Sequence, residues 1–221
     1  MFEVFLYRSP QDYDFIYYQQ KERREKLQYG LGRECLYLLE HTPVYTAGRR
    51  FQQKHLLISP EICKQRGIHF TYTDRGGDIT YHGPGQLVGY PILNLATREM
   101  TVHQYIRNLE LTIIDTLTCY RIHAQPIKTL TGVWVQDRKI SAIGIGVKDS
   151  ITWHGFSINI DLDLTPFEWI VPCGISDKKV TSLKNELQEK FFCPTVKEFA
   201  QTFISVFSKH FSVPELSLVE I

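Results

Sequence analysis

The sequence lacks several patterns by which whole classes of protein are recognised. No run of about 18 uninterrupted apolar residues occurs, which is the length a helix needs to cross a membrane. The glycine-rich patterns G-x-G-x-x-G and G-K-[ST], which bind dinucleotides and nucleoside triphosphates, are also absent. There is little excess charge, since 25 lysines and arginines accompany 24 aspartates and glutamates. These absences argue against a membrane protein, a common nucleotide-binding enzyme, and a general affinity for nucleic acid.

Cysteine is scarce, and none of the five cysteines belongs to a C-x-x-C pair. Neither a disulfide framework nor a structural zinc site is therefore expected. The first residues do not have the basic start, apolar segment and small-residue cleavage site of a secretory signal. Acidic residues at Glu3, Asp12 and Asp14 argue against a transit peptide. We therefore expect a cytoplasmic protein with reduced thiols.

The chain does contain enough apolar residues, 43%, to build one domain over residues 1–221. Apolar residues with a period of two predict strands, and a period near 3.6 predicts helices. The expected strands cover 2–7, 35–40, 44–46 and 68–72, with an antiparallel meander of three strands between 132 and 162. The expected helices cover 11–29, 60–66, 101–117 and 195–211, and another follows Leu183 toward Gln188. Strands and helices at irregular intervals indicate an α+β fold.

The most unusual stretch runs from Thr73 to Leu95, TDRGGDITYHGPGQLVGYPILNL. Five glycines lie within about a dozen positions, among side chains that form hydrogen bonds, and an apolar strand pattern follows directly. Glycine lets a backbone approach a ligand closely and adopt positive φ angles without steric strain. We therefore interpret this stretch as a substrate-binding loop on a rigid sheet.

Cys173 has surroundings that favour reactivity, because it lies in VPCGIS between a proline and a glycine. An exposed thiol near a cation or a helix N-terminus forms the nucleophilic thiolate more readily. From the residues alone, a structural role for Cys173 stays open. Cys35, Cys63, Cys119 and Cys193 lie in apolar segments or beside ordinary helix residues, so we expect them to be small buried hydrophobes.

Lys139 begins an otherwise apolar strand, KISAIGIGV. It is either solvated at the end of the strand or directed into a pocket, where it would stabilise a thiolate or act as a base. His41, His82 and His154 lie in or beside glycine or proline turns, but no metal-ligand spacing connects them. We expect them to form hydrogen bonds in a pocket and expect no metal. A serine hydrolase is also disfavoured, because no G-x-S-x-G sequence occurs.

Together, these motifs resemble one known family, the octanoyltransferases of lipoate biosynthesis. The matching blocks, in the family's order and spacing, are HTPVYTAGR, RGGDITYHGPGQLVGYPILNL, RKISAIGIGV, WHGFSINIDLDL and VPCGISDKKVTSL. They extend from Glu40 to Leu183, which is most of the chain. The resemblance implies a biotin/lipoate protein ligase-like fold. Such an α+β fold of the two-layer α/β type has a larger mixed β-sheet and a smaller sheet, flanked by helices.

The resemblance also implies a reaction and its partners. Octanoyl-acyl carrier protein would donate an octanoyl or lipoyl group. One lysine on the lipoyl domains of 2-oxoacid dehydrogenase complexes, or on the glycine cleavage H protein, would accept it. Cys173 would carry the acyl group as a thioester, and Lys139 would hold Cys173 in its thiolate form. No cofactor, metal, nucleic acid or membrane would take part.

The same resemblance implies two walls around the acyl group. One wall would consist of Arg75, Gly76, Gly77, Asp78, Ile79, Thr80, Tyr81 and His82. The other would consist of Ala142, Ile143, Gly144, Gly155, Phe156 and Ser157. Members of the family often have glutamine, glutamate or another polar residue in place of Asp78, so we interpret Asp78 as a tolerant position and not as a catalytic acid.

Three alternative functions stay open. An octanoyl amidotransferase that acts between lipoyl domains would also need a cysteine. An ATP-dependent lipoate or biotin protein ligase would need a nucleotide-binding loop and would not need Cys173. A non-catalytic module that binds lipoyl domains or carrier proteins would keep its function without Lys139 and Cys173.

Overall fold

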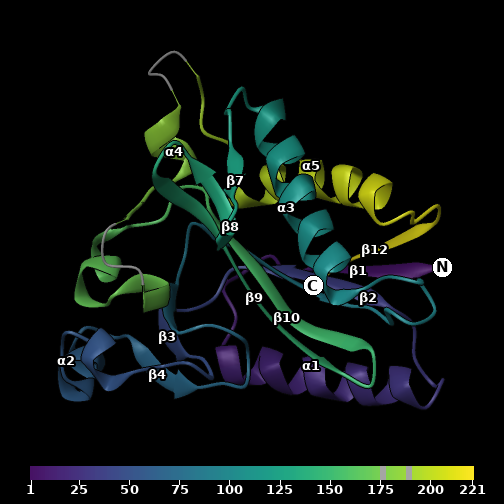
Figure 1. Ribbon diagram of the computed structural model, residues 1–221, viewed down its shortest axis with the longest axis horizontal. Coiled ribbons are helices and arrows are strands. Elements are labelled where there is room, and N and C mark those ends of the chain that lie inside the picture. The colour runs from purple at the N-terminus through teal and green to yellow at the C-terminus, as the bar shows by residue number, and fades with distance from the viewer. Residues whose placement is uncertain (175–177, 188–190) are drawn as a thin grey trace.

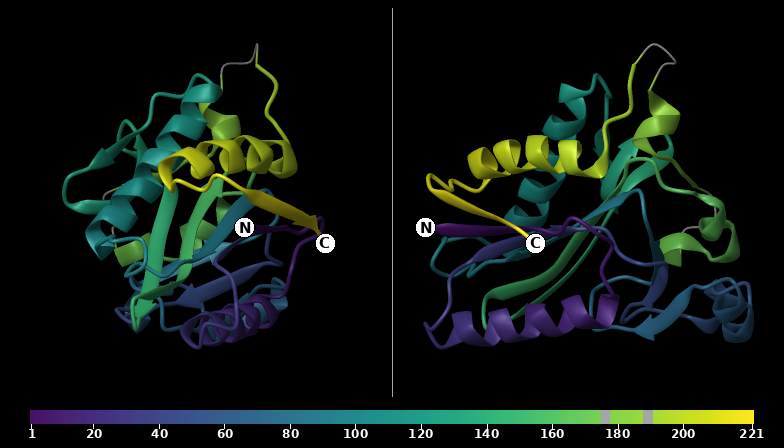
Figure 2. Two further views of the ribbon diagram at one scale, coloured as in Figure 1. Left: turned by 90° about the vertical axis from the view of Figure 1, so that its right-hand side faces the viewer. Right: turned by 180° about the vertical axis from the view of Figure 1, so that it is seen from behind.

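The computed structural model describes residues 1–174, 178–187 and 191–221, except for the side chain of Cys173. A large sheet forms the central layer. Helices α3 (Val102–Cys119) and α5 (Val196–His210) cover one face of this sheet, and α1 (Tyr13–Gln28) covers the other (Figure 1). A small sheet lies near the N-terminal end of α1, on the same side of the large sheet (Figure 2). The expected larger mixed sheet and smaller sheet with flanking helices are confirmed.

The large sheet contains nine strands among the described residues. In spatial order they are β12 (Leu216–Glu220), β1 (Phe2–Leu6), β2 (Cys35–Leu39), β6 (Gln86–Ile92), β10 (Ile151–Asn159), β9 (Arg138–Lys148), β8 (Leu130–Val135) and β7 (Gln125–Ile127), and β11 (Lys179–Val180) pairs with β9. The pairs of β1 with β12 and with β2 are parallel, whereas pairing from β2 through to β7 is antiparallel. The sheet is therefore mixed.

The small sheet has the order β4 (His69–Tyr72), β3 (Val44–Ala47), β5 (Ile79–His82). Strand β3 runs parallel to β4 and antiparallel to β5. Helix α2 (Pro60–Gln65) precedes β4 and begins after Ser59, whose hydroxyl accepts the backbone N–H of Ile62. Part of the glycine-rich stretch thus forms β5 of the small sheet, and another part forms β6 of the large sheet.

Helices α3 and α5 begin where the sequence provides capping residues. Thr101 accepts the backbone N–H of Gln104, and the Gln104 side chain accepts the backbone N–H of Thr101. Thr195 and Glu198 form the same reciprocal pair at the start of α5. Both helices bury apolar side chains against the sheet in one large core cluster. One face of the sheet is therefore fully packed, and the other face is left to build a site.

The antiparallel meander is confirmed, since β8, β9 and β10 follow one another in sequence and in space. Its first turn lies at Gln136 and Asp137, one residue earlier than expected, and Gln136 has a positive φ of 55°. Strand β12 was not predicted. Its partner β1 lies at the opposite end of the sequence, and most of its residues are at least partly exposed, so no local apolar period identifies it (Figure 2).

The expected burial of the cysteines is correct for only part of the set. Cys35 and Cys63 are buried, but Cys193 is half-buried and Cys119 is exposed as the last residue of α3. The helix expected toward Gln188 is the short α4 (Leu183–Glu186), and Gln188 lies outside the described residues. Within the described residues, none of the helices combines the length and the apolar composition needed to span a bilayer.

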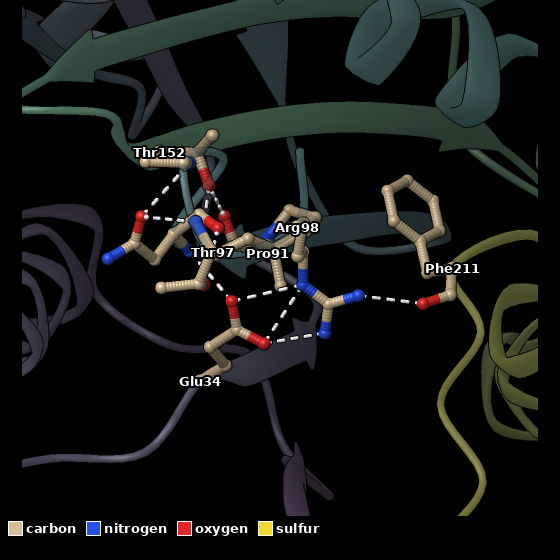
Figure 3. Close-up of polar contacts among 9 residues, drawn as sticks. Glu34, Pro91, Thr97, Arg98, Thr152 and Phe211 are labelled. Carbon is tan, nitrogen blue, oxygen red and sulfur yellow. Dashed lines mark hydrogen bonds and ion pairs between the residues drawn. The ribbon is translucent and has the colours of Figure 1, made fainter. Parts of the chain in front are cut away.

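A network of polar contacts joins segments that are distant in sequence (Figure 3). The Arg98 guanidinium donates to both oxygens of the Glu34 carboxylate, at 2.5 to 3.0 Å, and to the carbonyl of Phe211 at 2.7 Å. Beside it, the Thr152 hydroxyl donates to the carbonyl of Pro91 at 2.7 Å. The network fixes the start of β2, the turn before α3 and the end of α5 to each other.

Candidate active site

A cavity of about 300 Å³ lies on the face of the large sheet that α1 covers. Three neighbouring strands form its floor, and their pairing places Val88, Ser157 and Ala142 in one row. Two positions along, Gly155 on β10 pairs with Gly144 on β9. Residues separated by two positions in a strand lie on the same face of a sheet. The small side chains in these rows leave room for a ligand above the strands.

The glycine-rich segment between β4 and β5 covers part of this floor and is held by backbone hydrogen bonds. The Gly76 N–H donates to the carbonyl of Ile145 on β9 at 2.8 Å, and the Arg50 N–H donates to the carbonyl of Gly77 at 2.9 Å. Gly77 has a φ of +94°, which favours glycine. A Cβ atom at Gly144 would lie 2.9 Å from the Gly76 oxygen. Glycines in both segments therefore allow the loop to approach the strand this closely.

The structure divides the expected first wall into three groups. Arg75, Gly76, Gly77, Thr80 and His82 line the cavity. Ile79 and Tyr81 instead pack into a separate apolar cluster, because side chains alternate along β5. Asp78 lies against a histidine outside the cavity, described below. The expectation that the whole run from Arg75 to His82 lines one pocket is thus corrected. All residues of the expected second wall, Ala142, Ile143, Gly144, Gly155, Phe156 and Ser157, border the cavity. The side chains of Ile143 and Phe156, however, pack in the core on the opposite face of the sheet.

Two glycines of the same stretch serve internal packing rather than ligand access. A Cβ atom at Gly83 would lie 2.4 Å from the hydroxyl of Tyr81. Gly85 has a φ of +88°, and a Cβ atom there would lie 2.3 Å from the carbonyl of Asp161. Only some of the glycines in this stretch can therefore serve contact with a ligand.

Lys139 lies where the cavity meets a second, smaller one, and it lines both. The residue is only 8% exposed, and its Nζ atom is 5.1 Å from the centre of the Trp134 ring. A cation near an aromatic face is stabilised by the ring quadrupole. Gly132 makes the space for this side chain, since a Cβ atom there would lie 2.8 Å from Lys139 Cε. Of the two alternatives for Lys139, the structure places it inside the site.

The segment that carries Cys173 borders the smaller cavity. Cys173 belongs to the single turn η3 (Pro172–Gly174), and Pro172 lines the smaller cavity together with Lys139. The side chain of Cys173 itself lies outside the described part of the chain. The backbone beside it nevertheless brings the thiol-bearing turn and Lys139 to the same cavity.

A histidine that the sequence did not single out lies beside Gly174 of this turn. His55 ends the turn η1 (Gln53–His55), and its Nδ1 atom is 2.6 Å from the carboxylate of Asp78. The other Asp78 oxygen accepts the backbone N–H of Ile79 at 2.7 Å. A Cβ atom at Gly174 would lie 3.1 Å from this carboxylate and 3.4 Å from the imidazole. No motif in QKHLL marks His55, because its partners come from distant segments.

His82 and His154 line the cavity, and His41 packs against His82 with the ring centres 5.8 Å apart. Burial lowers the pKa of His82 to about 3 and that of His41 to about 4. His41 Nε2 is 2.7 Å from the Tyr90 hydroxyl, and His82 Nδ1 is 2.7 Å from the side-chain oxygen of Gln86. These residues form hydrogen bonds, as expected. In the part of the chain that the structure describes, no three His, Cys, Asp or Glu side chains are grouped to hold a metal ion.

His154 reaches this group only through an unusual backbone conformation. Its φ is +54° in the middle of β10. In a regular strand the His154 side chain would lie on the same face as Phe156, two positions along, which packs against α5. The imidazole Nε2 atom instead lies 2.7 Å from Asp74, and the ring stacks on Tyr17 of α1. Burial lowers the pKa of His154, although Asp74 opposes that effect. The strained backbone therefore turns a polar side chain toward the cavity.

A family model matches most of the chain. The model of the lipoyl protein ligase A/B catalytic domain matches residues 15–208. The octanoyltransferase of Solibacter usitatus is 47% identical over 182 residues, which cover 79% of this chain and 80% of that protein.

Solved structures are similar in fold. A lipoate-protein ligase A bound with ATP matches with a TM-score of 0.79 and 16% identity, covering 100% of this chain and 90% of that one. The biotin protein ligase of Aquifex aeolicus in complex with biotin and ATP matches with a TM-score of 0.58 and 14% identity, covering 95% and 70%. At these identities the likeness concerns the fold alone.

Proposed function

This chain belongs to the lipoyl protein ligase A/B catalytic domain family and is an acyltransferase, and we propose that it transfers an octanoyl group from acyl carrier protein to one lysine of a lipoyl domain. The acceptors are the lipoyl domains of 2-oxoacid dehydrogenase complexes and the glycine cleavage H protein. One observation carries the proposal. The buried Lys139 joins the main cavity to a smaller cavity bordered by Pro172, the residue before Cys173.

In the first half-reaction, Cys173 takes the acyl group from the carrier. The Cys173 thiolate attacks the carbonyl carbon of the donor thioester, and the bond from that carbon to the carrier's sulfur breaks. The departing sulfur takes a proton from the Lys139 ammonium. One thioester replaces another, so the step requires no nucleotide.

In the second half-reaction, the acceptor lysine takes the acyl group from Cys173. Its neutral amine attacks the thioester carbon, and Cys173 leaves as a thiolate. The amine loses one proton, which Lys139 accepts, so that the ammonium and the thiolate are restored together. The product is an amide, which is more stable than the thioester that it replaces.

The main cavity holds the acyl chain in this proposal. The part of the floor that β9 forms extends from Lys139 to Gly144. These residues are five positions apart, and each position in a strand adds about 3.3 Å. Val88 provides apolar surface, while the loop at Gly76 and Gly77 covers the chain. The apolar part of the lining suits an eight-carbon chain, and the polar part is available to the carbonyl end of the acyl group.

A comparison of donors tests the proposal against its alternatives. The purified protein is incubated with a lipoyl domain and with one of three donors: octanoyl-acyl carrier protein, the octanoylated H protein, or octanoate with ATP. We expect the lipoyl domain to gain one octanoyl group from the carrier without ATP. A lipoyl domain whose acceptor lysine is replaced by arginine is the control and gains none.

Each contrary result identifies another function. Transfer that strictly requires ATP would indicate a ligase, and transfer from the H protein alone would indicate an amidotransferase. Binding of the carrier or the lipoyl domain without any transfer would indicate a non-catalytic module.

A further inference from the structure

The lining of the main cavity carries more positive charge than a neutral acyl chain requires. Three basic side chains belong to it, those of Arg50, Arg75 and Lys139, and the described lining residues include no aspartate or glutamate. Clefts lined by charge of one sign concentrate ligands of the opposite sign. The cavity is therefore complementary to a group with negative charge, and the octanoyl chain has none.

Two of these three cations have tasks in the interior. Arg75 is buried and donates from Nε to the Thr46 hydroxyl at 3.1 Å, which joins the glycine-rich loop to β3. Lys139 is also buried and exchanges protons in the proposed reaction. Arg50 is exposed, as is its neighbour Arg49. Among the described residues, neither of these two guanidinium groups has a hydrogen-bond or ion-pair partner.

The exposed members of the lining show where the cavity opens to solvent. Arg50 follows β3 of the small sheet, whereas Thr129 precedes β8 of the large sheet and Thr131 belongs to β8. Segments of both sheets therefore form the mouth of the cavity. Lys128 is exposed as well and adds another cation next to Thr129.

Backbone hydrogen bonds hold Arg49 and Arg50 against the glycine-rich loop. The Arg49 N–H donates to the carbonyl of Arg75 at 3.1 Å, and the Arg50 N–H donates to the carbonyl of Gly77 at 2.9 Å. Burial lowers the pKa of His154, a lining residue, and the charges of Arg75 and Arg49 lower it further. Both exposed arginines thus act on the cavity from a backbone that is already in place.

We propose that Arg49 and Arg50 bind the phosphodiester of the phosphopantetheine arm through which acyl carrier protein carries the acyl group. This inference rests on the proposed function for the identity of the donor. The arm has its thioester at one end and its phosphodiester at the other, next to the carrier. When the acyl chain is inside the cavity, the phosphodiester stays near the mouth. Guanidinium groups suit it, because their paired N–H donors match two phosphate oxygens.

The test measures binding of two probes in which an amide replaces the thioester, so that no transfer can occur. One probe is the octanoyl amide of phosphopantetheine, and the other differs only in lacking the phosphate. Isothermal titration calorimetry gives the Kd of each probe. One variant combines Arg49→Gln with Arg50→Gln, and a second combines Arg49→Lys with Arg50→Lys and so keeps the charge.

Arg33→Gln is the matched control. Arg33 is an exposed arginine that forms no ion pair with a described residue and does not line the main cavity. Its replacement removes one positive charge from the molecule without changing the mouth of the cavity. It should bind both probes as the wild type does.

We expect the wild type to bind the phosphorylated probe about tenfold more tightly than the other, as charge-assisted contacts near the surface allow. The glutamine variant should bind the two probes within about twofold of each other, because it lacks those contacts. The lysine variant should keep a preference of about fourfold, since lysine retains the charge without the paired donors. Raising the salt concentration from about 50 mM to about 500 mM should weaken the wild-type preference by screening.

Three results would overturn the inference. The first is a wild type that binds both probes equally or binds neither. The second is a preference for the phosphate that persists in the glutamine variant, which would indicate that other residues hold it. The third is a glutamine variant that binds the intact carrier more weakly but both probes normally, which would indicate contact with the carrier's protein surface.

Transfer from octanoyl-acyl carrier protein to a lipoyl domain is measured in parallel. In the glutamine variant, the KM for the carrier should rise by about tenfold with kcat unchanged, as loss of uniform binding predicts. Because neither probe is a substrate, absence of transfer in the wild type would contradict the proposed function alone. A failure of that function is thereby distinguished from a failure of this inference.

Discussion

His41 and His82 are buried, and the hydrogen bonds of His41 are satisfied only in its neutral form. His41 Nδ1 is 3.0 Å from the carbonyl of Gln11, which can only accept, so this nitrogen carries the proton. His41 Nε2 then accepts from the Tyr90 hydroxyl at 2.7 Å. A second proton on His41 would break that hydrogen bond and would place a charge in a fully buried position.

These histidines predict a loss of stability in mild acid. The folded pKa values, about 4 for His41 and about 3 for His82, are below the ordinary value of 6.5, so the unfolded chain binds more protons than the folded chain between these limits. The free energy of unfolding should therefore decrease as the pH falls from about 6.5 toward about 4. Urea unfolding at several pH values measures it. His41→Gln, which does not titrate, should show a shallower decrease, and an equal slope in both proteins would contradict this explanation.

The sequence predicts those residues of the site whose type and immediate neighbours indicate reactivity. A cysteine between proline and glycine, and a lysine before an apolar strand, can be identified from sequence. The contact of His55 could not be, because its partner Asp78 is 23 positions away and approaches it only after folding. Ile79 and Tyr81 were expected to line the pocket but pack into a separate apolar cluster, because a motif does not show which of its residues alternate away from a pocket.

At the scale of the elements, strand pairing sets the positions of the site residues. The register of β9 with β10 places Ala142 opposite Ser157 and Gly144 opposite Gly155. Strand β11 pairs with the start of β9, opposite Arg138 and Lys139, and so returns the chain after the thiol-bearing turn to the lysine. The period-two pattern predicted the meander itself. It could not predict β12 or β11, which are short or partly exposed and pair over long distances in sequence.

We expect the network around Arg98 to stabilise the folded protein without affecting its activity. Arg98→Met should lower the free energy of unfolding by about 2–3 kcal/mol, because it leaves the Glu34 carboxylate and the Phe211 carbonyl without their charged donor. Urea denaturation measures the change. Activity per folded molecule should be unchanged, since none of these residues lines the main cavity.

Arg8→Met is the matched control for this variant. Arg8 pairs with Glu220 at 2.9 Å, and its side chain is 67% exposed. Exposed pairs of this kind contribute less than about 1 kcal/mol. If the two variants were equally destabilised, the joining of β2, α3 and α5 through Arg98 would not be the source of the effect.

At the scale of the whole molecule, the two faces of the large sheet have different tasks. The face under α3 and α5 is a closed apolar core, while the face under α1 and the small sheet contains the cavity (Figure 1). The fold class was predictable because apolar periods and capping residues are local features. The position of the small sheet against the large one was not, since loops with few apolar residues, such as the one at Gly76, determine it.

The most direct test of the account is the intact mass of the protein after incubation with octanoyl-acyl carrier protein and no acceptor. We expect one octanoyl group on Cys173, which disappears when a lipoyl domain is added, and none on Cys173→Ser. Lys139→Ala should acquire the group more slowly, by on the order of a hundredfold or more, as expected on loss of a positioned acid–base group. Transfer to the lipoyl domain without an acylated enzyme, or the same acyl group on Cys173→Ser, would contradict the account.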